Sequence, residues 1–488
     1  MCIAPIAHRA RLVVLTTLCK KIMRKFQEEQ DKLLNTLLEK LFFKHWKVSY
    51  DHNGAVDQTY PSIELFVTPS CNQKCEYCYL HKYEALYPRE VNNRETILKN
   101  CRILFDWIME NGYIHLPGMD LFSGEIYHTQ LAWDIFDLIL EYMDKGWKLQ
   151  KLTIPTNGSF MLKQETTDKA QYYIDEFRKR NCQLAFSFSI DGYVVDKQAR
   201  PLRSDKEEGL RDKDFYDRVM KFAIKNQLCF HPMLAASDVN KWKENLDWWY
   251  DTMKKCQMNY RERVGILEVR NANWTEQNLK DYCGLLTYAV DRQIKEEFDN
   301  NPDRFIYSIF GVSSPISGGI NTMFMDECSQ YGCTIPHQLT IRLGDLAIAP
   351  CHRTAYPELL YGKFNVEDGK ITGIEAKNVY TAMKVLTADM RTTLIGCDTC
   401  DFKTFCMHQC YGNSKEEAGD PFIRVENVCE LLKVGIYHKI KLYNDRGYYD
   451  RLKELAVKDP KITSALIKKH FEVRDKILKH KEFDKYEV

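Results

Sequence analysis

The sequence predicts an α/β fold in which helices cover a parallel β-sheet. Short apolar runs of strand length alternate with longer segments whose apolar residues recur at helical spacing. This strand–helix unit occurs six times in succession before about residue 299. Because helical crossovers join parallel strands, the pattern indicates a sheet that is open or barrel-like. We expect a partial (β/α)6 barrel of the TIM type.

The first predicted element is an amphipathic helix over residues 20–47, where apolar side chains fall at helical spacing among many charged ones. The polar stretch DHNGAVDQTYP follows it and is rich in turn-forming residues. We therefore expect an N-terminal helical segment that ends before the sheet begins.

The six strand–helix units come next. The first strand, SIELFVTPS, is a short apolar run, and its helix ends at Gly112, a residue type that often follows a helix. In a barrel of this kind the chemistry lies at the C-terminal ends of the strands. The predicted pairs are residues 62–70 and 94–112, 119–124 and 128–146, 151–158 and 167–181, 183–192 and 215–226, 228–236 and 241–255, and 265–272 and 276–298.

Composition divides the chain further. A loop-like stretch follows the last unit, then a region dense in cysteine, then a charged helical tail. We predict residues 1–60 as the N-terminal helical segment, 61–300 as the barrel, 301–325 as a linker, 326–435 as a cysteine-rich domain and 436–488 as a helical tail.

The charge and hydropathy of the chain argue against nucleic-acid-binding and membrane-spanning classes of protein. The chain has 69 Lys and Arg against 68 Asp and Glu, which does not suggest nucleic acid as a partner. No apolar run approaches the roughly 18 residues that a membrane helix needs, so we expect no membrane partner. The N-terminus lacks the pattern of a secretion signal, and we expect a cytoplasmic protein.

Eighteen cysteines are unusual for such a protein, because thiols in a reducing compartment usually bind metal or take part in redox chemistry. Seven of them are scattered along the chain, and we interpret these as small buried apolar residues. The remaining eleven fall into groups: Cys71, Cys75 and Cys78; Cys328, Cys333 and Cys351; and Cys397, Cys400, Cys406, Cys410 and Cys429.

The first group, in TPSCNQKCEYCYL, has the spacing C-x3-C-x2-C just beyond the first predicted strand. Structural zinc is bound by four ligands, usually in two pairs, and this trio has no nearby fourth cysteine. A cubane iron–sulfur cluster fits three thiolates better, because one iron then stays open to another ligand.

The last group begins with CDTCDFKTFCMHQC, which has the spacing C-x2-C-x5-C-x3-C. A zinc ribbon is a competing interpretation of this segment alone. The three cysteines upstream favour clusters, because eight cysteines divide into two sets of four that each close a thiolate site.

The cysteine motif after the first strand of a six-unit α/β barrel resembles that of the radical S-adenosylmethionine superfamily. The resemblance implies a [4Fe-4S] cluster whose open iron binds S-adenosylmethionine. Its reductive cleavage yields a 5′-deoxyadenosyl radical that abstracts a hydrogen atom from the substrate. The resemblance also implies an external electron donor such as flavodoxin or ferredoxin.

Further residues match that superfamily at the strand ends. SGE resembles its GGE motif, TNG follows the third strand, and SIDG follows the fourth. Arg200 follows Asp196 by one residue more than the usual spacing, and Glu268 is either a site contact or a packing residue. The implied cofactor contacts are Tyr77, Ser123, Gly124, Glu125, Asn157, Ser189, Asp191 and Arg200, with Glu268 and His352 as catalytic candidates.

The later cysteines resemble the SPASM domain, a C-terminal extension of radical enzymes that modify peptides and proteins. The resemblance implies two auxiliary [4Fe-4S] clusters, three clusters in all. One auxiliary cluster is bound by Cys328, Cys333, Cys351 and Cys410, and the other by Cys397, Cys400, Cys406 and Cys429.

We therefore predict an enzyme that oxidatively modifies a peptide or protein, such as a ribosomally made precursor, by a crosslink, a thioether or a related bond. The alternatives are a radical enzyme acting on a small molecule, a sulfatase-maturing type, and a non-enzymatic iron–sulfur protein for electron transfer or structure. The sulfatase type typically has Asp after the third cysteine of the first auxiliary site, where this chain has His352.

Overall fold

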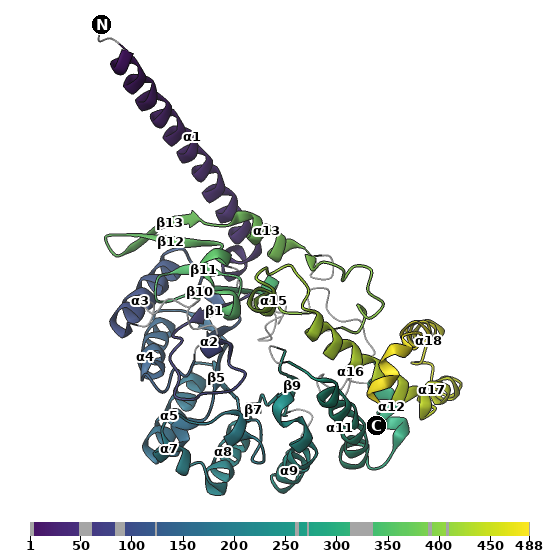
Figure 1. Ribbon diagram of the computed structural model, residues 1–488. Helices are drawn as coiled ribbons and strands as arrows, with labels where there is room; N and C mark the ends of the chain where they lie inside the picture. Colours follow the sequence, from purple (N-terminus) through teal and green to yellow (C-terminus); the bar gives the residue numbers. More distant parts are fainter. Residues whose placement is uncertain are drawn as a thin grey trace.

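The computed structural model describes residues 4–47, 61–82, 93–122, 124–258, 263–270, 273–312, 335–388, 393–406 and 409–487. Side chains are described from residue 21 onward, apart from those of residues 81, 82 and 336. Ser123, Cys328 and Cys333 lie outside the described residues. The chain forms an α/β structure with one large mixed sheet, and helix α1 runs away from the rest of the molecule (Figure 1).

The large sheet has nine strands in the order β13-β12-β11-β10-β1-β3-β5-β6-β7. Its second half is parallel and follows chain order, which confirms the predicted α/β class. The strands of this half are β1 Ser62–Phe66, β3 Met119–Phe122, β5 Lys151–Thr156, β6 Gln183–Phe188 and β7 Cys229–Phe230. The helices between them are α3 Arg94–Glu110, α4 Leu131–Asp144, α5 Gln164–Lys179 and α8 Lys213–Asn226.

The fifth predicted strand is interrupted after β7. Pro232 has no amide hydrogen to donate to a ladder, and pairing resumes only at β8, Met233–Leu234. Strand β8 is parallel to β9, Leu267–Glu268, and Phe230 is bridged to Val264. Segment 264–268 therefore lies beside segment 230–234, and α9 Trp242–Lys255 and α11 Glu276–Glu297 complete the last two units.

The first half of the sheet was not predicted. Strand β10, Gln338–Arg342, pairs in parallel with β1, so that Ile63 faces Leu339. Three antiparallel strands extend it: β11 Ala347–Ala349, β12 Gly362–Glu367 and β13 Lys370–Ala376. The sheet thus continues from the segment predicted as a barrel into the segment predicted as a cysteine-rich domain.

The N-terminal helix, α1, spans Ala4–Leu41 and is followed by a short helix at Phe43–Trp46. Its C-terminal part packs on the body through buried Leu34 and Leu38. Gln27 Nε2 donates to the Ala376 carbonyl at 2.8 Å, and the Ala376 amide donates to Asp31 Oδ1 at 2.7 Å. The helix therefore meets the end of edge strand β13 from Gln27 onward.

Helices form most of the C-terminal part, and α16 packs along α11 (Figure 1). Helix α12, Pro302–Ile309, lies within the predicted linker. The others are α13 Val379–Thr387, α15 Tyr411–Ala418, α16 Glu426–Asp445, α17 Tyr448–Ala456 and α18 Ser464–Ile477. Short elements elsewhere are α2 Tyr79–Lys82, α6 Asp196–Ala199, α7 Asp205–Gly209, β2 His115–Leu116 and β4 Lys148–Leu149.

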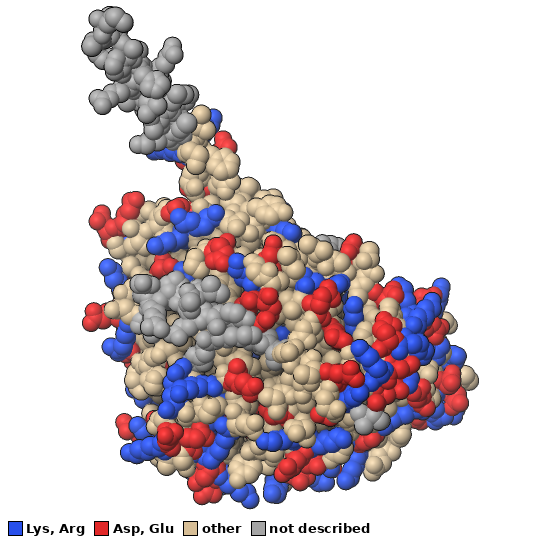
Figure 2. All heavy atoms as spheres, viewed as in Figure 1, with Lys and Arg blue, Asp and Glu red and all other residues tan. Residues whose placement is uncertain are grey.

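The surface carries mixed charge. Positive and negative side chains are interspersed on the face shown in Figure 2, most densely over the C-terminal helices. Within the described part of the chain, no helix is both long enough and apolar enough to cross a bilayer.

Candidate functional site

The cysteine loop, residues 71–78, is held in place by a second segment of backbone that follows β6. The amides of Lys74 and Glu76 donate to the carbonyls of Pro201 and Ala199 at 2.8 and 3.1 Å. In return, the Arg203 amide donates to the Asn72 carbonyl at 2.8 Å. These bonds form a short ladder, so the loop after the first strand is fixed by residues about 130 positions later in the chain.

The three cysteines of the loop are partly exposed as residues, but the surroundings of Cys71 and Cys75 favour the neutral thiol. The Gln73 amide donates to Cys71 Sγ at 3.4 Å, and burial, reinforced by the Glu125 carboxylate, raises the pKa of the Cys71 thiol to about 12. Burial also raises the pKa of Cys75. Metals bind the thiolate, so metal binding here releases protons. No three His, Cys, Asp or Glu side chains in the described ranges form a group that could hold a single metal ion.

Half-buried Tyr77 of this loop contacts a buried ion pair formed by Asp191 and Arg200. The Tyr77 hydroxyl donates to Asp191 Oδ2 at 2.5 Å, and Arg200 Nε lies 2.9 Å from Asp191 Oδ1. The guanidinium also lies 5.2 Å from the centre of the Tyr77 ring. Although Asp196 is nearer in sequence, it pairs with Arg211 instead. Arg200 therefore brings one positive charge close to Cys75.

Gly124 and Glu125, at the end of β3, pack directly on the start of the cysteine loop. The Gly124 amide donates to the Thr68 carbonyl and the Glu125 amide to the Ser70 carbonyl, each at 2.8 Å. A Cβ atom on Gly124 would lie 2.3 Å from the Ser70 carbonyl oxygen. Glycine is therefore required here for close approach of two backbone segments.

The Glu125 carboxylate is fully buried and accepts hydrogen bonds from the next strand end. Thr156 Oγ1 lies 3.1 Å from each carboxylate oxygen, and the Asn157 amide donates to Oε2 at 2.7 Å. Burial outweighs these bonds and raises the pKa of Glu125 to about 7. At neutral pH this carboxyl is thus close to half-ionised.

Asn157, whose amide binds Glu125, also contacts the cysteine loop through its side chain. Its Nδ2 atom donates to Asn72 Oδ1 at 2.8 Å, and Asn72 Nδ2 donates to Ser159 Oγ at 3.0 Å. Ser189 is half-buried, and its amide donates to the Thr156 carbonyl at 2.7 Å. We call Glu125, Asn157, Asp191 and Arg200 the strand-end cluster, because they follow the ends of β3, β5 and β6 and gather around the cysteine loop, whose own Tyr77 contacts Asp191.

Glu268, on β9, has a different set of neighbours. Tyr282 of α11 donates its hydroxyl to Glu268 Oε1 at 2.6 Å. Lys439 of α16 is buried nearby, and burial lowers the pKa of its ammonium to about 8 despite the opposing charge of Glu268. The contacts of Glu268 thus join the sheet to the C-terminal helices.

His352 lies over the end of β3 and is held by a buried carboxylate of β1. Its Nδ1 atom is 2.8 Å from Glu64 Oε2, and its amide donates to Glu64 Oε1 at 2.7 Å. The imidazole stacks on Phe122 with 3.4 Å between ring centres and 6° between planes. Phe122 directly precedes the SGE motif, so the structure brings His352 to the same edge of the sheet as Glu125.

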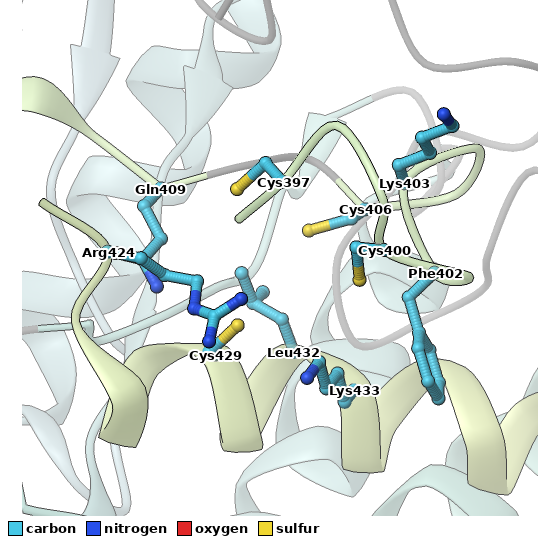
Figure 3. Close-up of a pocket in the computed structure, with 10 residues that line it drawn as sticks. All are labelled: Cys397, Cys400, Phe402, Lys403, Cys406, Gln409, Arg424, Cys429, Leu432 and Lys433. Carbon is cyan, nitrogen blue, oxygen red and sulfur yellow. The ribbon is translucent and has the colours of Figure 1, made fainter. Parts of the chain in front are cut away.

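Cys397, Cys400, Cys406 and Cys429 line one pocket, which we call the four-cysteine pocket (Figure 3). Three come from consecutive turns, and Cys429 comes from the first turn of α16. Gln409 ties these turns to the start of α16 by bonds of 2.6 Å to both the amide and the carbonyl of Val425. The side chains of Arg424 and Lys433 flank the sulfur atoms in Figure 3.

Cys410 occupies the N-cap position of α15 and does not line the four-cysteine pocket, but its segment packs against the one that follows Cys351. The link is Arg353, whose guanidinium lies close to Cys410 and pairs with Glu416 at 2.7 Å. Gly412 allows this packing, because a Cβ atom there would lie 2.6 Å from Arg353 Cγ. The two segments that carry Cys351 and Cys410 are thus packed together across 59 residues of sequence.

Sequence reasoning missed several residues of this region. Glu64 had a usable signal, since a charged residue within the apolar run SIELFV requires a buried partner. Asn72 and Thr156 had no such signal, because polar residues in loops and strand ends are common. Their importance appears only when the strand ends are brought together.

Comparison with protein-family models and with curated proteins finds no match to this chain.

Proposed function

We propose that this chain is a radical S-adenosylmethionine enzyme with a SPASM-type C-terminal region, and that it oxidatively modifies a peptide or protein. One observation carries the proposal: the cysteine loop lies against the strand-end cluster, whose members come from segments spread between residues 125 and 200. A loop that only held a structural metal would need no such set of polar neighbours.

The residues present fit the cofactor. Cys71, Cys75 and Cys78 would hold a [4Fe-4S] cluster by three irons and leave one without a protein thiolate. Glu125 and Arg200 would contact S-adenosylmethionine, whose methionyl part carries both an amino group and a carboxylate. When bound, the cluster supplies the electron for reductive cleavage of S-adenosylmethionine, which is the source of the radical chemistry.

The protein's own groups prepare this site. Tyr77 and Asp191 fix the Arg200 guanidinium near Cys75, where a positive charge offsets the negative charge of thiolates. Thr156 and the Asn157 amide orient the Glu125 carboxylate. Each contact reduces the reorganisation that binding of a charged ligand would otherwise require.

The strand order supports a partial barrel. Strands β1, β3, β5, β6 and β7 lie in chain order in the parallel half of the large mixed sheet, and β8 continues the order to β9. We propose that these strands, with β7 and β8 counted as one interrupted strand, form the six strands of a (β/α)6 barrel. The cysteine loop would lie at the end of the barrel where the C-termini of the strands meet.

The C-terminal cysteines fit two auxiliary clusters. The four-cysteine pocket would supply four thiolates to one cluster, and Arg424 and Lys433 would offset its negative charge. Cys351 and Cys410 would serve the other, together with Cys328 and Cys333. With every iron bound by the protein, electron transfer or structural support is the role we propose for both.

For the substrate, we propose a peptide or protein rather than a small molecule, because the SPASM resemblance is to enzymes of that kind. An external donor such as flavodoxin or ferredoxin would supply the electrons. His352 would exchange a proton with substrate through Nε2, since Glu64 binds the Nδ1 side of the ring. A sulfatase-maturing activity is disfavoured by His352 in place of Asp.

The test is anaerobic reconstitution with iron and sulfide, followed by dithionite and S-adenosylmethionine. We expect 5′-deoxyadenosine to form, and the variant with Cys71, Cys75 and Cys78 changed to Ala to lose this activity and about four irons per chain. The matched control is Cys229→Ala, because Cys229 is exposed and belongs to none of the three cysteine groups. Iron binding without any 5′-deoxyadenosine would instead support a non-enzymatic iron–sulfur protein, and a protein that takes up only zinc would overturn both readings.

A further inference from the structure

The N-terminal helix has an unusual charge. Residues 1–27 contain six Lys and Arg and no Asp or Glu, whereas the rest of the chain has 63 Lys and Arg against 68 Asp and Glu. A nearly neutral protein therefore carries a segment of strongly positive charge next to a body of net negative charge. Segregation of this kind is typical of segments that contact an anionic surface.

The turns of α1 directly before its first contact with the body, residues 21–26, are exposed on all sides. Every residue from Lys21 to Phe26 is exposed, and the first contact of the described helix with the sheet is made by Gln27. Figure 1 shows the helix leading away from the remainder of the molecule before this point. The body therefore does not cover this turn and a half of helix.

The exposed turns are amphipathic. Ile22, Met23 and Phe26 share one side of the helix at positions i, i+1 and i+4, with 58%, 66% and 56% of their surface exposed. Lys21, Arg24 and Lys25 project from the other side. No other five-residue window among the described residues exposes three large apolar side chains.

We propose that α1 binds the surface of a membrane containing anionic phospholipid, with Ile22, Met23 and Phe26 in the headgroup boundary and the cations against phosphate groups. A helix with an apolar side and a basic side lies in the plane of such an interface rather than across it. This revises the expectation of no membrane partner, which depended on the lack of an apolar run of about 18 residues. Such a run is needed to span a bilayer and not to lie on one.

A second copy of the chain could also cover the exposed turns of α1, but charge disfavours it as the partner. Two α1 helices side by side would bring twelve cations together within residues 1–27, without any acidic residue there to offset them. Anionic lipid removes that repulsion and buries the same apolar side chains. The positive charge of α1 therefore favours an anionic lipid surface over a second copy of the chain as its partner.

The experiment uses the full chain and flotation with two vesicles, one of phosphatidylcholine alone and one with about 30% phosphatidylglycerol. We expect binding to the anionic vesicle only, and loss of binding at high salt because salt screens exposed charges. The triple variant Lys21→Gln, Arg24→Gln, Lys25→Gln should bind about 100-fold more weakly, at about fivefold per cation. Phe26→Ser should weaken binding about tenfold.

Matched controls lie in the exposed turn between α17 and α18 and on α18. Lys458→Gln, Lys461→Gln and Lys468→Gln together remove the same charge, and Val457→Ser removes an apolar side chain that is 86% exposed. Neither control should change vesicle binding. Equal loss in the controls, equal binding to both vesicles, or no binding to either would overturn the proposal. So would a concentration-dependent dimer, seen by sedimentation equilibrium, that Phe26→Ser dissociates in a protein without affinity for vesicles.

Discussion

The cysteine loop and the four-cysteine pocket present thiols in opposite settings. Around the loop, buried Glu125, Asp191 and Arg200 stand next to three cysteines. The four-cysteine pocket instead combines four thiols with three cations, one amide and two apolar side chains, and none of its described lining residues is a carboxylate.

The difference indicates what each site can bind. In the function we propose, a cluster bound by the four thiols would fill this pocket, and Arg424 and Lys433 would offset its negative charge. In the same proposal, the three thiols of the cysteine loop would leave the buried Glu125 and Arg200 to contact a polar, zwitterionic ligand. Substitutions that affect one setting and leave the other intact test this contrast.

The largest effect is expected from Asp191→Ala. This change leaves the Arg200 guanidinium buried without its ion-pair partner, which typically costs about 3–5 kcal/mol in the free energy of unfolding. The measurement is urea unfolding of the metal-free protein at pH 7.5. Asp134→Ala is the matched control, since its pair with Arg94 is solvent-exposed and worth about 1 kcal/mol or less. Equal losses in the two variants would contradict the buried pair.

Glu125 should give the stability of the metal-free protein a pH dependence of defined sign. Its pKa is about 7 in the folded protein and near 4.5 when unfolded, so the neutral carboxyl is favoured by folding. Stability is then highest below about pH 4.5 and falls by about 3 kcal/mol as the pH rises through 7. Glu125→Gln removes this fall.

The readout for Glu125 is the difference in unfolding free energy between wild type and variant from pH 4.5 to 7.5. Glu141→Gln serves as the control, because Arg102 and Lys145 hold the pKa of Glu141 at about 2 and little titration remains in this range. A difference that stays constant with pH would show that Glu125 ionises normally.

Gly124→Ala should cost about 1–3 kcal/mol, because the new Cβ meets the backbone of Ser70, which cannot rotate away. The displaced loop should also retain less iron after reconstitution, while the four-cysteine pocket keeps its share. Gly118→Ala, just before the same strand, is the control, since its nearest contact is an ordinary 3.5 Å to Ser62 Cβ. Thermal unfolding and iron content of both variants decide the outcome, and equal values would contradict the close approach.

The smallest effect is expected in the four-cysteine pocket. Burial raises the pKa of the Cys429 thiol, and Lys433 and Arg424 partly oppose that rise. Lys433→Gln should therefore raise the pKa of this thiol further and slow its alkylation by iodoacetamide about threefold at pH 8 in the metal-free protein. Peptide mapping by mass spectrometry measures the rate, with exposed Cys229 in the same sample as internal control. An unchanged rate would mean that Lys433 does not act on the thiol.

The sequence by itself determined the α/β class and the position of the cysteine loop after the first strand. Both depend on local information: strand and helix periodicity, and the spacing of thiols along a few residues. The candidate residues at the ends of β3, β5 and β6 could be named for the same reason, because parallel strands bring their C-terminal ends to one edge.

Tertiary structure alone decided which partners these residues take. Arg200 pairs with Asp191 and not with Asp196, which is nearer in sequence. Glu64 of the first strand binds His352, which lies 288 positions later in the chain. It also decided that β10 joins the sheet beside β1. A buried charge or an unpaired strand edge binds the partner that tertiary packing places next to it. The spacing of residues along the chain does not show which partner that is.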